Sequence, residues 1–159
     1  MPEPEGPVAG RGLKVGVAVA AFNAFVTEGL LQGALEALAA AGVEDPAVLR
    51  VAGSFELPVA AKALVASGCD AVVALGAVIK GETDHYEHVA AQTIAGLQQV
   101  ALTTGVPVAL GVLTARKAEQ ARARSLPGPG NKGAEAAEAA VQAAAAIRRL
   151  GGRAGGPDR

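Results

Sequence analysis

The chain has 159 residues and a formal net charge of −1 at pH 7, and 51% of its residues are hydrophobic but only 3% aromatic. This length suits one domain with a sizeable core, and the near-neutral charge offers no net attraction to nucleic acid, so we expect no polyanionic partner. No apolar run approaches the length of a membrane span, and the first residues, MPEPE, lack the positive start of a signal peptide, so we expect a cytoplasmic protein with no membrane contact.

Apolar runs alternate with stretches of helical periodicity along the chain. Residues 1–12 are rich in Pro, Gly and Glu and are expected to be extended or mobile. Strands are predicted at 13–20, 46–52, 71–79 and 106–113, and helices at 27–41, 57–67, 84–104, 116–124 and 131–150. Gly42 and Gly105 should end the first and third helices, and Pro58 suits the first turn of the second. The tail at 151–159 is flexible by composition.

Strands that alternate with helices predict a parallel sheet with right-handed crossovers. The run 71–79 is apolar throughout, which suits the buried centre of such a sheet. We therefore expect an α/β fold, a three-layer α/β/α sandwich with a central four-stranded parallel sheet. The apolar excess also suggests buried subunit interfaces. Because ligands of open α/β sheets bind outside the carboxyl ends of the strands, functional residues should follow the strands.

The segment after the central strand, Lys80–His85, places a Gly and ionisable side chains where a helix should begin. Thr83 or Asp84 can cap that helix, and the free amides beside it offer a site for an anion. His85 falls in the first helical turn and suits a proton shuttle, with His88 as its solvated neighbour. A metal site on the two histidines is not expected, because their side chains point about 60° apart on a helix and a third protein ligand is needed.

Phe22 and Phe55, two of the three phenylalanines, fall in loops that follow strands. In a chain so poor in aromatic residues, such rings suit stacking on a flat ligand, although a ring that plugs the end of the sheet is the ordinary alternative. Glu56 could favour a helix N-terminus by its charge or accept hydrogen bonds from a polyhydroxylated ligand, and the sequence leaves these alternatives even. The single cysteine, Cys69, excludes an intrachain disulfide and fits a buried, inert thiol.

One motif match is rejected on its context. Residues 128–133 spell G-x-G-x-x-G, the dinucleotide-binding pattern, and a helix follows them. A true fingerprint follows a strand and opens the first βαβ unit, whereas this one follows an Arg-rich helix near the end of the chain. We therefore expect no dinucleotide site here.

Five blocks of the sequence resemble the signature of the 6,7-dimethyl-8-ribityllumazine synthase family, in order and with its spacing. They are Phe22-Asn23, GSFELP at 53–58, GAVIKGETDHYEHV at 76–89, TTGVPVALGVLT at 103–114 and GNKGAEAA at 130–137. The resemblance covers residues 13–150 and implies a flavodoxin-like fold and a transferase of riboflavin biosynthesis. It implies condensation of 5-amino-6-ribitylaminouracil with 3,4-dihydroxy-2-butanone 4-phosphate to the lumazine, with loss of water and phosphate and with no metal or organic cofactor.

The resemblance also implies roles for individual residues. His85 matches the proton-transfer histidine of the family. The matched substrate-binding positions are Phe22 and Asn23 at the pyrimidine, Ser54 and Glu56 at the ribityl chain, Val78 and Ile79 at the uracil edge, and Lys80, Gly81, Glu82 and Thr83 at the phosphate-binding turn. Arg124 and Lys132 match residues that a neighbouring subunit supplies, to the phosphate and near the substrates respectively, and Phe55 belongs near that interface. Leu110 replaces a frequent Phe, which removes a ring from the interface side of the pocket.

A site shared between subunits implies a homo-oligomer. The ring of the family is a pentamer, and in some members twelve pentamers form an icosahedral shell. Residues 130–133 carry no insertion, so the shell is expected to be accessible, and riboflavin synthase is a candidate partner. Leu110 and an atypical loop at 125–129 leave one alternative open, a shell-forming homologue with impaired catalysis. A second alternative is a flavodoxin-like protein that binds flavin.

Overall fold

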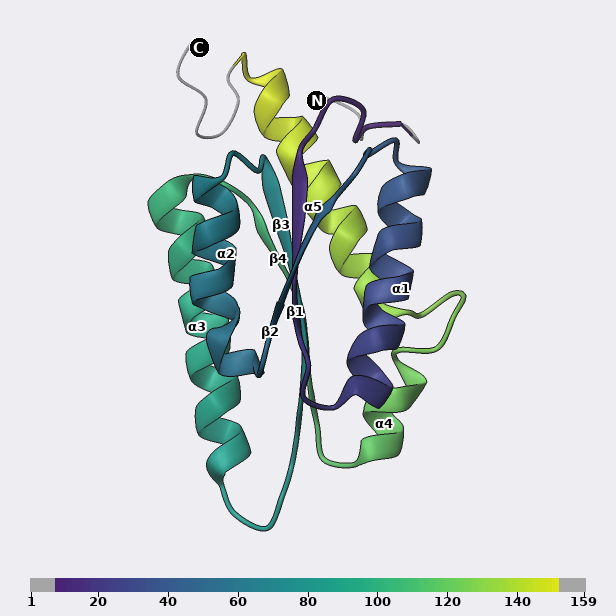
Figure 1. Ribbon diagram of the computed structural model, residues 1–159, viewed down its shortest axis with the longest axis vertical. Helices are drawn as coiled ribbons and strands as arrows, with labels where there is room; N and C mark the ends of the chain where they lie inside the picture. The colour runs from purple at the N-terminus through teal and green to yellow at the C-terminus, as the bar shows by residue number, and fades with distance from the viewer. Residues whose placement is uncertain (1–7, 152–159) are drawn as a thin grey trace.

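Four parallel strands form one sheet in the order β2-β1-β3-β4 in the computed structural model, which describes residues 8–151 (Figure 1). The strands are β1 (Val15–Ala20), β2 (Ala47–Val51), β3 (Ala71–Ile79) and β4 (Val108–Ala115). Helices cover both faces of this sheet, which confirms the predicted three-layer α/β/α sandwich. β4 begins and ends two residues later than predicted, since Pro107 has no N–H for the ladder and Thr114 and Ala115 still pair with β3.

Two helices pack on each face of the sheet. The helical elements are α1 (Ala24–Ala40), the 3-10 turn η1 (Ser54–Glu56), α2 (Leu57–Ala66), α3 (His85–Thr104), α4 (Ala118–Ala123) and α5 (Lys132–Arg149). Helices α1 and α5 lie together on one face, with α4 below them, and α2 and α3 on the other (Figure 1). Gly42 and Gly105 follow α1 and α3 in the left-handed conformation, as predicted for helix ends. Among residues 8–151, no helix has the length and apolar character needed to cross a membrane.

The core divides into two clusters, one on each face of the sheet. Neighbouring residues of a strand point to opposite faces, so Val73 of β3 packs in the cluster with Leu30 of α1, and Val72 in the cluster with Leu57 of α2. Residues 71–78 are all buried, as expected for a strand covered on both sides. Small side chains fill much of both clusters, which allows the helices to lie close to the sheet.

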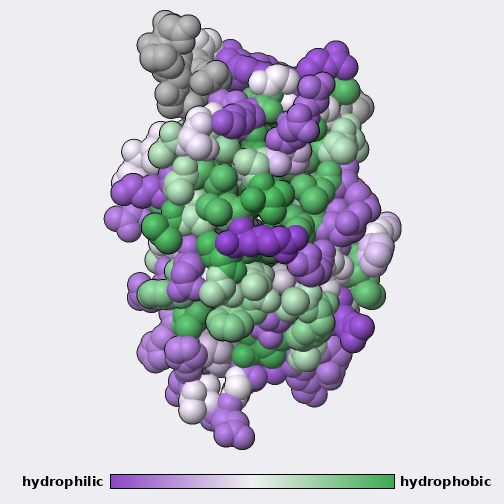
Figure 2. All heavy atoms as spheres, viewed as in Figure 1, coloured by the Kyte–Doolittle hydropathy of each residue, from purple (hydrophilic) through white to green (hydrophobic). Residues whose placement is uncertain are grey.

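The edge strand β2 is less covered. Its residues alternate between partly buried and exposed, and Val48 is exposed. Figure 2 shows apolar side chains gathered across the middle of the face that Figure 1 views, with hydrophilic side chains around and between them.

Residues 8–12, which we expected to be extended or mobile, form turns instead. The Gly10 N–H donates a hydrogen bond to the Ala41 carbonyl at 2.8 Å, and the Arg148 guanidinium donates to the carbonyl of the buried Ala9 at 3.3 Å. These bonds attach the segment to the ends of α1 and α5. The rest of both predicted tails lies outside the described residues, and the division of the chain at 12 and 150 stays a prediction.

Candidate active site

A cavity of about 440 Å³ lies at the carboxyl end of the sheet, between the loops after β1 and β2, the end of β3 and the start of α3. Eight of the predicted site residues line it: Phe22, Asn23, Ser54, Phe55, Glu56, Val78, Ile79 and His85. The carboxyl-end rule for parallel sheets therefore located the cavity from the sequence.

Phe22 presents its ring to this cavity. The Phe22 N–H donates to the Ala52 carbonyl at 2.9 Å, and the Asn23 side-chain amide donates to the Ala77 carbonyl at 2.8 Å. A side chain at Gly53 would lie 2.9 Å from the ring, so glycine allows the ring to approach this loop. Phe22 is 68% exposed, which does not fit a ring that plugs the end of the sheet. This exposure leaves the face of the ring free for a flat ligand.

Glu56 is held by its own loop. Its Oε1 accepts a hydrogen bond from the Gly53 N–H at 2.9 Å, and the residue directly precedes α2. The neighbouring Ser54 is buried, and its carbonyl accepts a bond from the Thr93 hydroxyl at 3.2 Å. The carboxylate thus closes the 3-10 turn η1 that precedes α2, makes no capping bond to α2 itself, and also faces the cavity. Its second oxygen, Oε2, is the one left to meet a ligand.

α3 begins at His85, one residue after the predicted start, so His85 lies in the first helical turn as predicted, and it is exposed on the cavity wall. Its N–H donates to the Thr83 hydroxyl at 3.3 Å, whereas the Asp84 side chain makes no capping bond, so Thr83 is the residue that satisfies a helix-start amide. The exposed turn Lys80–Asp84 joins Ile79 to His85, and both of these line the cavity. The predicted phosphate turn therefore adjoins the cavity at the positive end of α3.

Residues 8–151 contain no group of three or more His, Cys, Asp or Glu side chains that could hold a metal ion.

Cys69 lies at the amino end of the sheet, opposite the cavity, and is 2% exposed. Burial raises the pKa of its thiol, so the group stays protonated and unreactive near neutral pH, in agreement with a buried, inert cysteine.

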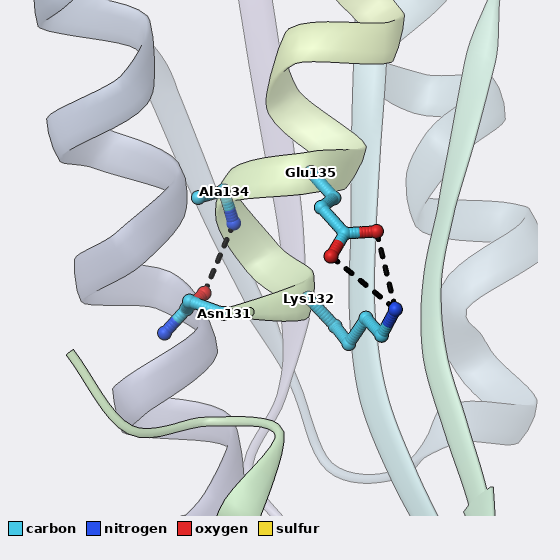
Figure 3. A network of polar contacts seen from close by, with 4 residues as sticks. All are labelled: Asn131, Lys132, Ala134 and Glu135. Carbon is cyan, nitrogen blue, oxygen red and sulfur yellow. Dashed lines mark hydrogen bonds and ion pairs between the residues drawn. The ribbon is translucent and has the colours of Figure 1, made fainter. Parts of the chain in front are cut away.

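Seven of the predicted residues do not line the first cavity: the four of the turn at 80–83, which adjoins it, and Leu110, Arg124 and Lys132. Leu110 and Lys132 line a cavity of about 370 Å³ between β4 and α5. The Lys132 ammonium lies 3.2 Å from both carboxylate oxygens of Glu135 (Figure 3). Arg124 follows α4, and its guanidinium donates to the Gln120 carbonyl at 2.8 Å. Leu110, Arg124 and Lys132 therefore do not line the cavity beside Phe22 and His85 in their own chain.

Sequence reasoning missed four residues of the cavity wall, namely Gly53, Ala77, Tyr86 and Val89. Val89 lies four residues after His85 in α3, and this helical spacing would have placed it on the same face. Ala77 precedes the predicted pair Val78 and Ile79 in β3.

Comparison with known proteins gives a consistent result. A family model described as 6,7-dimethyl-8-ribityllumazine synthase matches residues 12–148. The 6,7-dimethyl-8-ribityllumazine synthase of Anaeromyxobacter dehalogenans (strain 2CP-C) is 50% identical over 149 residues, which are 92% of this chain and 92% of that protein. A protein of the same name from Syntrophus aciditrophicus (strain SB) is 46% identical over 149 residues, which are 92% of this chain and 97% of that protein.

Proposed function

Because the chain belongs to the 6,7-dimethyl-8-ribityllumazine synthase family, we propose that the cavity beside Phe22, Glu56 and His85 binds the two substrates of that reaction. The enzyme is a transferase of riboflavin biosynthesis, and it condenses 5-amino-6-ribitylaminouracil with 3,4-dihydroxy-2-butanone 4-phosphate to the lumazine, phosphate and water.

One observation carries the assignment of the site: three side chains of different chemistry, from distant parts of the chain, border a single cavity. The free ring of Phe22 suits stacking on the flat pyrimidine. The free oxygen of Glu56 suits the hydroxyl groups of the ribityl chain. His85 suits the proton transfers that the condensation requires.

The chemistry needs positioning more than a nucleophile. The aromatic amine attacks the ketone, loss of water gives a Schiff base, and elimination expels phosphate. The second amine then attacks the remaining carbonyl carbon, and loss of a second water closes the ring. Each step moves protons, which His85 can accept and return, and no step needs a covalent bond to the enzyme. Holding two reactants together offsets roughly 7–11 kcal/mol of the barrier in favourable cases.

The phosphate of the butanone substrate suits the turn at Gly81, Glu82 and Thr83. This turn is exposed, and α3 begins directly after it, so the positive end of the helix favours an anion there. Glu82 adds a negative charge to the turn, and a cation from elsewhere would offset it. We assign that role to Arg124.

Arg124 and Lys132 lie outside the cavity of their own chain, so the proposal places them in the site of a neighbouring subunit. Such a contact is head-to-tail and closes into a ring, the pentamer of the family. Large exposed apolar side chains support extensive contacts between chains, since Val59 is 66% exposed and Leu102 is 73% exposed. An icosahedral shell of twelve pentamers and binding of riboflavin synthase extend this proposal.

The test is to mix purified protein with both substrates and follow the lumazine by its absorbance and fluorescence. Formation of lumazine that depends on the protein supports the proposal. An assembled protein that forms none would be a shell protein without catalysis, and a yellow protein that transfers electrons but forms no lumazine would be a flavin binder.

A further inference from the structure

We propose that Asn131 is a positioning residue that fixes Arg124 and Lys132 relative to each other. Asn131 directly precedes Lys132 and is only 3% exposed. The inference rests on the proposed function, because it takes Arg124 and Lys132 as the substrate-binding cations.

The Asn131 side chain bonds in two directions. Its amide nitrogen lies within hydrogen-bond distance of three carbonyls, those of Gly29 at 3.1 Å, Ser125 at 3.1 Å and Leu126 at 3.0 Å. Two hydrogens serve these three acceptors, so one of the bonds is shared. Its Oδ1 accepts the Ala134 N–H at 3.0 Å and thereby caps α5 (Figure 3).

These bonds close the loop that carries both cations. The Lys132 N–H donates to the Arg124 carbonyl at 2.9 Å, and the next two carbonyls along the chain, at Ser125 and Leu126, are the ones bound by Asn131. The loop therefore leaves α4 and enters α5 at fixed points. The Arg124 and Lys132 side chains start from this frame.

Two glycines on α1 make room for it. A methyl group at Gly29 would overlap the Ser125 carbonyl, and one at Gly33 would overlap the Asn131 amide. The glycines lie four residues apart, so they share one face of α1. A helix cap needs only the bond to Ala134. The glycine pair and the bonds to three carbonyls are not required for a cap, so they point to a second role, holding the loop.

Asn131→Asp separates the two roles. Aspartate has the same shape and still caps α5, but it places a carboxylate in front of three carbonyl oxygens and removes every donor. We expect the loop to shift while α5 remains. Because a misplacement of about 1 Å can cost on the order of 100-fold, kcat/KM for the butanone phosphate should fall on the order of 10- to 100-fold.

The readout is the comparison between the two substrates. The KM for the butanone phosphate and the inhibition constant of inorganic phosphate should rise, with a smaller change in the KM for the pyrimidine. A general loss of stability would not raise the KM for the butanone phosphate and the inhibition constant of phosphate more than the KM for the pyrimidine. The matched control is Thr104→Val, which removes the hydroxyl bonds to the Val100 carbonyl at 2.6 Å and from the Val106 N–H at 3.2 Å, at the other end of the sheet. It should lower the melting temperature without this selectivity.

Two results would overturn the inference: kcat/KM within twofold of the parent protein, or an equal rise in KM for both substrates. If Asn131→Asp fails to assemble, Asn131→Ser decides, since serine caps a helix but is too short to reach the loop carbonyls, and it should show the same selectivity. If the parent protein forms no lumazine, the proposed function has failed. The inference is then judged by hydrogen exchange of the Lys132 amide, which should be faster in Asn131→Asp than in Thr104→Val, and equal exchange would contradict it.

Discussion

The side-chain amide of Asn23 donates a hydrogen bond to the Ala77 carbonyl at 2.8 Å and so ties the loop after β1 to the central strand. Asn23 has a φ of 63°, in the left-handed region that asparagine tolerates better than alanine. Asn23→Ala should lower the free energy of unfolding by about 2 kcal/mol, from the lost bond and the strained backbone. It should also raise the KM for the pyrimidine, because Phe22 is the preceding residue.

Urea denaturation and steady-state kinetics measure these effects. Asn23→Gly is the matched control, since it loses the same bond but accepts the left-handed backbone, and it should be the more stable of the two variants. Equal stability of Asn23→Ala and the parent protein would show that neither the bond nor the backbone conformation matters.

For His85, we expect His85→Ala to lower kcat on the order of 10- to 100-fold. General acid–base catalysis raises a rate by up to about 10⁴-fold, and water can partly replace the histidine. The control is His88, which is exposed and lies three residues after His85 in α3, and His88→Ala should leave kcat unchanged. Single-turnover kinetics would separate the chemical steps from product release. An unchanged kcat in His85→Ala would remove this residue from the proton transfers.

Arg124→Gln should raise the KM for the butanone phosphate on the order of 10- to 100-fold, since hydrogen bonds to charged groups contribute roughly 1.5–3 kcal/mol each. The KM for the pyrimidine should change far less. Arg122→Gln, which removes an exposed guanidinium from the last turn of α4, is the control for charge alone. An equal rise for both substrates in Arg124→Gln would indicate a structural role.

The sheet and its functional end could be predicted because the signals are local. The apolar run of β3 lies between Asp70 and Lys80, and its predicted bounds coincide with the observed ones. α1 begins three residues earlier than predicted, because the left-handed turn at Asn23 starts the helix before its regular apolar spacing appears. The meeting of Phe22 and His85 at one cavity followed from the carboxyl-end rule.

The surroundings of Asn131 could not be predicted in the same way. A cap at 131 agrees with the predicted start of the last helix, but nothing local shows that the side chain is buried. Its burial depends on Gly29 and Gly33, about 100 residues earlier, and on how α1 packs against α5. The sequence gives the residue types of such a network, and only the packing brings them together.

Cys69 provides a test of the fold that is independent of the activity. Burial raises the pKa of its thiol above the ordinary value of 9.0, so above about pH 9 the unfolded chain releases a proton that the folded chain retains. The thiol's contribution to stability is therefore complete below pH 9 and is lost as the pH rises through the folded pKa. Above about pH 9, the free energy of unfolding should fall more steeply for the parent protein than for Cys69→Ala, by at most about 1.4 kcal/mol per pH unit. Parallel curves would mean that the thiol is solvated.

The central claim is that His85 of one subunit and Arg124 of the next form one active site, and mixing two impaired variants tests it most directly. His85→Ala and Arg124→Gln chains are unfolded together, reassembled at equal amounts and checked for mixed rings by native mass spectrometry. At each of the two positions in a shared site the chance of the intact residue is about one half, so about one quarter of the sites should be complete. Rings of His85→Ala chains with chains that carry both substitutions contain no intact histidine and should stay at the level of His85→Ala. With the butanone phosphate held below the KM of the parent protein, recovery of about one quarter of the parent activity is the predicted result. No recovery in verified mixed rings would show that the two residues act within one subunit.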